Sequence, residues 1–162
     1  MIRRSRKVEG VSRLRDAHHI DDMVRPAVGI GVMVERDGKF LLGRRKGAHG
    51  AGTYGWPGGG LEFGESLINA VRREAREEAG IEVLDFELVC ISNVVDYGRH
   101  YLDLEFRVKN FAGEPLLCEP QTIESWAWYA LDALPEPLFA PCELALASLR
   151  DSRLLNDSTS RE

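Results

Sequence analysis

The chain has 162 residues, of which 44% are hydrophobic and 29% are charged, and its formal net charge is −5. These values are typical of one globular domain that is long enough to bury a core. The negative charge argues against a nucleic-acid polymer as partner, because no basic face is expected to release counterions. No apolar run approaches the ~20 residues that would span a bilayer, so no membrane partner is expected.

Cysteine usage indicates the cellular compartment. The three cysteines, Cys90, Cys118 and Cys142, form no CxxC pair. An odd count without a signal segment is typical of reduced thiols in the cytoplasm. We therefore expect a cytoplasmic protein whose cysteines act as small buried hydrophobic residues.

Residues 1–24 are predicted to be a polar N-terminal extension. Arginine and lysine residues are scattered among polar ones there, and no apolar stretch suggests secretion. A solvated tail is the expected structure. The alternative is a basic arm that contacts substrate phosphates or a partner.

The next segment predicts strands around a glycine-rich loop. From Ala27 the residues alternate, with Gly29, Gly31 and Met33 on the face opposite the valines, which is typical of a strand. Asp37-Gly38 is a favourable hairpin turn, so residues 39–45 are predicted to return as its partner strand. Glycines within residues 46–54 indicate a flexible loop, and residues 58–60 are a glycine run that lets backbone approach a ligand closely.

The second half predicts helices that alternate with strands. An apolar stripe at helical spacing predicts a helix over residues 66–79, with Gly80 as its left-handed C-terminal cap. One or two strands are expected within residues 81–95, followed by strands at 101–109 and 124–129 and a last helix over 142–150. Residues 151–162 are predicted to be a frayed polar C-terminal tail.

Three carboxylates are expected on one face of the helix over residues 66–79. Glu74 precedes Glu77 and Glu78 by three and four residues, a spacing that places side chains next to one another. Like charges at that spacing destabilise a helix by about 0.2–0.5 kcal/mol per pair. A divalent cation such as Mg²⁺, which prefers oxygen ligands, would turn this repulsion into attraction. The sequence therefore predicts a metal site.

The spacing around these glutamates resembles the Nudix box of the MutT-like pyrophosphohydrolases. All nine defined positions match, namely Gly59, Glu65, Arg73, Glu74, Ala75, Glu77, Glu78, Gly80 and Ile81. The box covers residues 59–81, and a looser resemblance covers residues 25–150, which we predict to be the Nudix domain. The resemblance implies an α/β fold, the Nudix α/β/α sandwich, with a mixed central sheet and a box that forms loop, helix and loop.

The resemblance also assigns a metal and its ligands. Glu74, Glu77 and Glu78, helped by the backbone carbonyl of Gly59, are expected to bind Mg²⁺, for which Mn²⁺ can substitute. The same three glutamates make up the predicted catalytic group. The implied reaction is substitution at phosphorus by water, with metal ions neutralising the phosphate oxygens.

Two further roles follow from the same resemblance. Glu65 and Arg73 are expected to form a supporting ion pair, because a guanidinium can bind a carboxylate through two parallel hydrogen bonds. Either Glu77 or Glu78 is expected to be the general base. Members of the family differ in this respect, and some recruit an acid from outside the box. The alternatives here are Asp96, Asp103 and Glu105.

The segments around the box resemble the MutT-related nucleoside triphosphate pyrophosphatases, chiefly at residues 25–29, 43–47 and 61–65. This implies hydrolysis of a nucleoside triphosphate, with an ordinary, oxidised or modified base, to the monophosphate and pyrophosphate. The alternatives are a family member that acts on ADP-ribose, NADH, a nucleotide sugar, a dinucleotide or a pterin triphosphate, and a ligand sensor without turnover. Val95 occupies the position where the ADP-ribose branch usually carries a proline.

Six residues are predicted to contact the substrate, namely Arg44, Arg45, Gly58, Tyr101, Asp103 and Phe139. One of the arginines is expected to clamp a phosphate, and Gly58 belongs to the glycine run that approaches the ligand. Asp103 can accept hydrogen bonds from guanine N1–H and the amino group, and an aromatic side chain can stack on a base. The alternatives are surface charge for the arginines and an outward polar strand face for Tyr101 and Asp103. Members of the family are often dimers, which allows a homodimer.

Overall fold

The computed structural model describes residues 25–47 and 49–158, so the predicted N-terminal extension lies outside the described residues. The strands are β1 (Ala27–Arg36), β2 (Lys39–Arg45), β3 (Tyr54–Gly55), β4 (Gly58–Gly60), β5 (Glu82–Asp96), β6 (Arg99–Ala112), β7 (Ile123–Ala130) and β8 (Leu155–Asp157). The helices are α2 (Leu67–Ala79), α3 (Ala140–Asp151) and the short 3-10 helix η1 (Leu131–Ala133). Within the described ranges, no helix is both long and apolar enough to cross a membrane.

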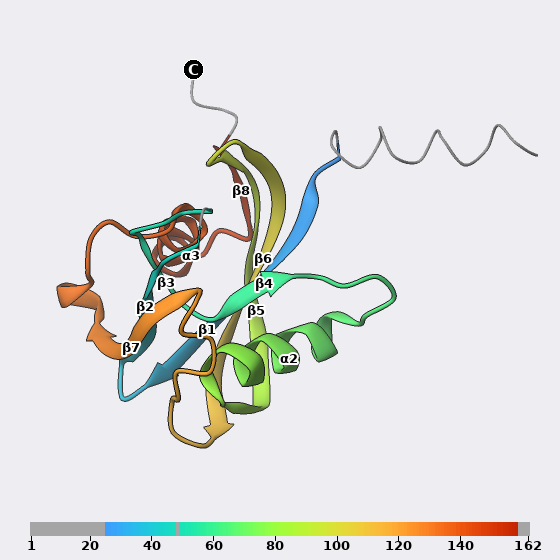
Figure 1. Ribbon diagram of the computed structural model, residues 1–162. Helices are drawn as coiled ribbons and strands as arrows, with labels where there is room; N and C mark the ends of the chain where they lie inside the picture. The colour runs from blue at the N-terminus through green and yellow to red at the C-terminus, as the bar shows by residue number, and fades with distance from the viewer. Residues whose placement is uncertain (1–24, 48, 159–162) are drawn as a thin grey trace, which may run out of the picture.

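The strands form a mixed sheet that lies between α2 and α3 (Figure 1). Neighbouring strands follow the order β3-β2-β1-β6-β5-β8, while β4 also pairs with β1 and β7 with β2. The pair β1–β6 at the centre is parallel, whereas β1–β2 and β5–β6 are antiparallel. The predicted α/β/α arrangement around a mixed sheet is therefore confirmed.

Strand β1 supplies side chains to both layers of the core. Val32 and Val34 lie in one buried cluster with Ala75 of α2, and Met33 lies in a second cluster with Ala145 of α3. Successive side chains of a strand point to opposite faces, so one alternating segment can pack against both helices. Full burial of each aliphatic side chain contributes about 1.5–3 kcal/mol, which makes β1 a main source of stability.

Helix α2 begins and ends where the sequence predicts. The Ser66 hydroxyl accepts a hydrogen bond from the Asn69 backbone N–H at 3.2 Å, as an N-terminal cap does. Gly80 follows the last turn in the left-handed region, with φ of 65°, and its N–H bonds back to carbonyls of the helix. These two caps fix the ends of the helix that carries the glutamates.

The hairpin of β5 and β6 is longer than predicted. β5 is one strand that reaches Asp96, and β6 begins at Arg99, so only Tyr97 and Gly98 form the turn. Both turn residues have positive φ, 51° for Tyr97 and 71° for Gly98, as a two-residue hairpin turn requires. A tyrosine is an uncommon residue in that conformation, which is why the turn is not recognisable from the sequence.

Residues after α3 are incorporated into the sheet, so the predicted frayed tail is wrong for residues 155–157. β8 pairs in parallel with β5. Asn156 is 9% exposed, and its amide donates to the hydroxyls of Ser92 at 3.1 Å and Ser148 at 2.7 Å. A run of polar residues usually indicates a solvated tail, but here the Asn156 side chain is hydrogen-bonded to two buried serines.

Two smaller differences concern α3 and the cysteines. α3 begins at Ala140 rather than Cys142, with Pro141 in its first turn, where the missing N–H costs nothing. Cys90 and Cys142 are buried as expected, but Cys118 is exposed.

Candidate active site

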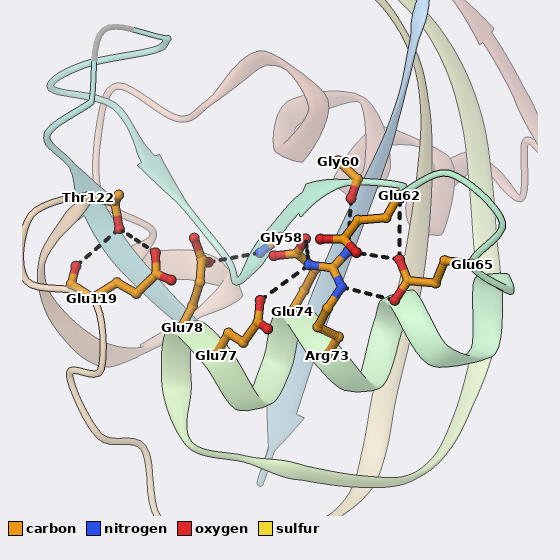
Figure 2. Close-up of polar contacts among 10 residues, drawn as sticks. All are labelled: Gly58, Gly60, Glu62, Glu65, Arg73, Glu74, Glu77, Glu78, Glu119 and Thr122. Atoms are coloured by element: carbon orange, nitrogen blue, oxygen red, sulfur yellow. Dashed lines mark hydrogen bonds and ion pairs between the residues drawn. The ribbon is translucent and has the colours of Figure 1, made fainter.

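The glutamates of α2 lie against the glycine strand β4 (Figure 2). Glu74 is only 6% exposed, and a Cβ atom at Gly59 would lie 2.5 Å from its Oε1 atom. The backbone N–H of Gly58 donates to Oε2 of Glu78 at 3.0 Å. The absence of a side chain at residue 59 therefore makes room for the Glu74 carboxylate beside the loop.

Arg73 ties the loop to the helix. Its Nε and Nη2 atoms donate to the two oxygens of Glu65, both at 2.9 Å, as the supporting pair requires. The same guanidinium donates to Glu74 Oε1 at 2.6 Å and to the carbonyl of Gly60 at 2.9 Å. Figure 2 shows this guanidinium between the carboxylates of Glu65 and Glu77. Arg73 thus orients a predicted metal ligand as well as Glu65.

The carboxyl groups of the site differ in the direction in which their pKa values are shifted. Burial raises the pKa of Glu78 to about 7, although the Gly58 N–H acts in the opposite direction. Burial also raises the pKa of Glu74, against the effect of Arg73, while the hydrogen bond from Arg73 lowers the pKa of Glu65. A carboxyl group whose pKa lies near neutrality is suited to exchange a proton with a reacting water. Glu78 has this property.

The donor set fits a hard divalent cation in its chemistry. Glu74, Glu77 and Glu78 offer only oxygen atoms, on one helix face beside a backbone loop, which is the kind of site that Mg²⁺ takes. In the part of the chain that the structure describes, no three ligand-type side chains converge on one point. Arg73 Nη1 binds both Glu74 and Glu77, the latter at 3.3 Å. Glu77 is half exposed and can leave this contact.

A cavity of about 360 Å³ is lined by the glycine loop, which also contacts Glu74 and Glu78. Five of the six predicted substrate-contacting residues line it, namely Arg45, Gly58, Tyr101, Asp103 and Phe139. Arg44 does not, and its prediction as a substrate-contacting residue is not supported. Its Nη1 atom instead lies 3.4 Å from Glu124 Oε1 at the surface. Neighbouring residues of a strand point to opposite faces, so only one of the two arginines can reach the cavity.

The floor of the cavity is acidic. The parallel register of β1 and β6 places Gly29 opposite Asp103 and Gly31 opposite Glu105. A Cβ atom at residue 29 would lie 2.9 Å from Asp103 Oδ1, and one at residue 31 would overlap the Glu105 carboxylate. Asp103 is 8% exposed and Glu105 is 1% exposed, so the alternative of an outward polar face is wrong for Asp103. The two glycines of β1 make space for two buried carboxyl groups.

Sequence reasoning missed several residues of this cavity. Trp56 donates its indole N–H to Glu105 Oε2 at 2.6 Å. His49 lies with its ring centroid 4.9 Å from that of Tyr101 and 5.3 Å from that of Phe139, while the guanidinium of Arg45 lies 4.2 Å from the Phe139 ring. The position of Trp56 next to the glycine run could have indicated a role in the cavity. The glycine-rich composition of residues 46–54, which include His49, indicated only a flexible loop.

The close fit of Gly59 against Glu74 gives a direct test of the site. Gly59→Ala should lower activity by at least about 10-fold, because the added methyl displaces a carboxylate, and misplacement of a reacting group by ~1 Å can cost ~100-fold. Gly60→Ala is a matched control, since a Cβ at residue 60 meets no atom within 4 Å. Steady-state rates of both variants, with melting temperatures, check the prediction. Equal rates for the two variants would contradict it.

Comparison with known proteins identifies the same region. Residues 23–146 match the family model described as NUDIX domain. A crystal structure of a MutT NUDIX hydrolase from Burkholderia pseudomallei is 39% identical, with a TM-score of 0.73 over 76% of this chain and 97% of that one. The 8-oxo-dGTP diphosphatase of Escherichia coli (strain K12) is 31% identical over 130 residues, 79% of this chain and 98% of its own length.

Other relatives carry different names. An oxidized purine nucleoside triphosphate hydrolase from Danio rerio is 31% identical over 112 residues, 64% of this chain and 66% of its own length. Further relatives are named NAD-capped RNA hydrolase and ADP-ribose pyrophosphatase, and the chain spans 39% and 42% of their lengths. The chain therefore spans less than two thirds of several curated relatives that it matches.

Proposed function

The chain belongs to the Nudix family of hydrolases, and on this basis we propose that it is a Mg²⁺-dependent pyrophosphohydrolase of nucleoside triphosphates. The products would be the nucleoside monophosphate and pyrophosphate, as part of the upkeep of the nucleotide pool in the cytoplasm. The observation that carries the proposal is the cavity beside the box glutamates, with an acidic floor at Asp103 and aromatic rings at its side. A base fits such a cavity while its phosphates extend toward the glutamates of α2.

The glutamates of α2 and the glycine loop would perform the hydrolysis. A bound Mg²⁺, held by Glu74, Glu77, Glu78 and the Gly59 carbonyl, would neutralise the phosphate oxygens. We assign the general base to Glu78, because its carboxylate is partly buried and is oriented by the Gly58 N–H. Glu77 is half exposed and pairs with Arg73, which makes it the weaker candidate.

The remaining cavity residues would bind the substrate. Tyr101 would stack on the base, and such an aromatic contact is worth about 0.5–1.5 kcal/mol beyond its buried area. Phe139, whose ring stacks on Tyr97, would form a wall of the base pocket. Arg45 lines the same cavity and has its guanidinium over the Phe139 ring, from where it would approach a phosphate. We keep the homodimer as a proposal that the oligomeric state in solution will test.

The proposed function is tested by the products formed from a panel of substrates. The full chain is incubated with Mg²⁺ and the common and 8-oxo nucleoside triphosphates, ADP-ribose, NADH and GDP-mannose, and pyrophosphate and phosphate are measured separately. We expect pyrophosphate from one or a few triphosphates, loss of this activity with a chelator, and recovery with Mg²⁺ or Mn²⁺. Turnover of the diphosphate-linked compounds alone would move the protein to another branch of the family. Binding without turnover would make it a ligand sensor.

A further inference from the structure

Two buried polar atoms in the cavity lack a hydrogen-bond partner. Among the described residues, the buried side-chain atoms without a partner are Asp103 Oδ1 and His49 Nδ1, and both residues line the same cavity. A buried polar atom left unpaired costs about 1–3 kcal/mol, so proteins rarely keep one without a use. The positions of both atoms point to a ligand that completes their hydrogen bonds.

The two carboxyl groups on the cavity floor are not equivalent. Glu105 accepts the Trp56 indole N–H, and its complete burial together with the nearby Asp103 raises its pKa well above the usual range. Burial raises the pKa of Asp103 to about 6, while the positive charge of Arg45 acts in the opposite direction. Glu105 is the more completely buried of the two and its Oε2 atom accepts the Trp56 indole N–H, so Asp103 is the floor carboxyl group that has an atom without a protein partner.

We infer that Asp103 selects the base of the substrate, and that the site takes a base with two neighbouring N–H donors, the edge that guanine presents at N1 and its 2-amino group. The inference rests on the proposed function in one respect, namely that the ligand is a nucleotide. Beyond that function, it names Asp103 as the residue that discriminates between bases and states the chemical class of the base.

The chemistry of the other bases supports this choice. An ionised carboxylate only accepts hydrogen bonds, so the facing edge must donate. Adenine and cytosine each offer an amino donor next to a ring-nitrogen acceptor, and thymine and uracil place one N–H between two carbonyl oxygens. Each of these edges directs an acceptor at the carboxylate. Guanine alone among the common bases offers two adjacent donors, which a carboxylate can receive as a pair.

Glu105 would act as a positioning residue rather than touch the ligand. Its contact with Trp56 connects the cavity floor to the segment that continues into the glycine loop. Complete burial and the nearby Asp103 raise the pKa of Glu105, which disfavours a second negative charge beside Asp103. The glycines at residues 29 and 31 make this arrangement sterically possible.

The test measures binding, so that it does not depend on turnover. Isothermal titration calorimetry of the full chain compares dGMP with dIMP, which differs only by lacking the 2-amino group. We expect dGMP to bind at least about 10-fold more tightly, as is usual for a hydrogen bond to a charged group. Asp103→Asn should reduce this ratio to near one, because its amide cannot accept two donors. Asp85→Asn, an exposed carboxylate on the neighbouring strand, is the control.

Each outcome separates this inference from the proposed function. Equal binding of dGMP and dIMP by the wild type, or an unchanged ratio in Asp103→Asn, overturns the inference even if triphosphates are hydrolysed. Loss of the preference in Glu105→Gln with retention in Asp103→Asn also overturns it, since the charge would then lie on Glu105. A preference for dGMP that Asp103→Asn removes supports it even where no triphosphate is turned over. If Asp103→Asn does not fold, the wild-type comparison decides.

Discussion

Glu77→Gln and Glu78→Gln are each expected to lower kcat by at least ~100-fold. Glutamine keeps the size of the side chain but neither accepts a proton from water nor supplies a charged oxygen to a cation. The larger loss is expected for Glu78, whose carboxylate is partly buried and oriented by the Gly58 N–H. Single-turnover and steady-state rates with the best triphosphate of the panel measure the effect.

The control for these variants is Glu82→Gln. Glu82 lies at the start of β5, just beyond the box helix, and is exposed, so its neutralisation should leave kcat unchanged. Circular dichroism should show that all variants fold. Turnover like that of the wild type in both box variants would remove the site from the reaction.

Arg73→Ala is expected to lower the free energy of unfolding by about 2 kcal/mol, between the values for exposed and buried ion pairs. The substitution leaves the buried Glu74 carboxylate without its 2.6 Å partner and frees the loop carbonyl of Gly60. Urea denaturation in the absence of metal measures the change. Arg73→Lys should recover only part of it, because an ammonium cannot bind Glu65 through two parallel bonds.

Arg72→Ala is the matched control for this stability prediction. Arg72 is the preceding residue of the same helix and is exposed. Its removal should change the free energy of unfolding by no more than about 0.5 kcal/mol. If both variants unfold at the same urea concentration as the wild type, Arg73 does not tie the loop to the helix.

The box site could be predicted from sequence because its geometry is local. Glu74, Glu77 and Glu78 share a helix face through the period of the helix alone, and Ser66 and Gly80 mark the helix ends by their capping chemistry. The pairing of Arg73 with Glu65 also spans only eight residues of chain. The same spacing carries the family resemblance. None of these features needs a contact between distant parts of the chain.

The residues that line the cavity can be predicted only in part from the sequence. Alternation shows that Arg44 and Arg45 point to opposite faces, but it does not show which face contains the cavity. That depends on how β2 pairs with its neighbours, and the structure assigns the cavity to Arg45. The turn at Tyr97 and the strand at Asn156 are likewise set by contacts with distant partners.

The sequence alone determined the family, the helix that carries the box glutamates and the strands on which the substrate-binding candidates lie, because each follows from spacing within one segment. Only the tertiary structure decided that the polar residues of β6 form a buried cavity floor. That outcome depends on the parallel pairing of β6 with β1, which sets Gly29 against Asp103 and Gly31 against Glu105. A glycine in the sequence does not indicate which residue will lie beside it. The space that it leaves for a carboxyl group is therefore identified only from the pairing of the two strands.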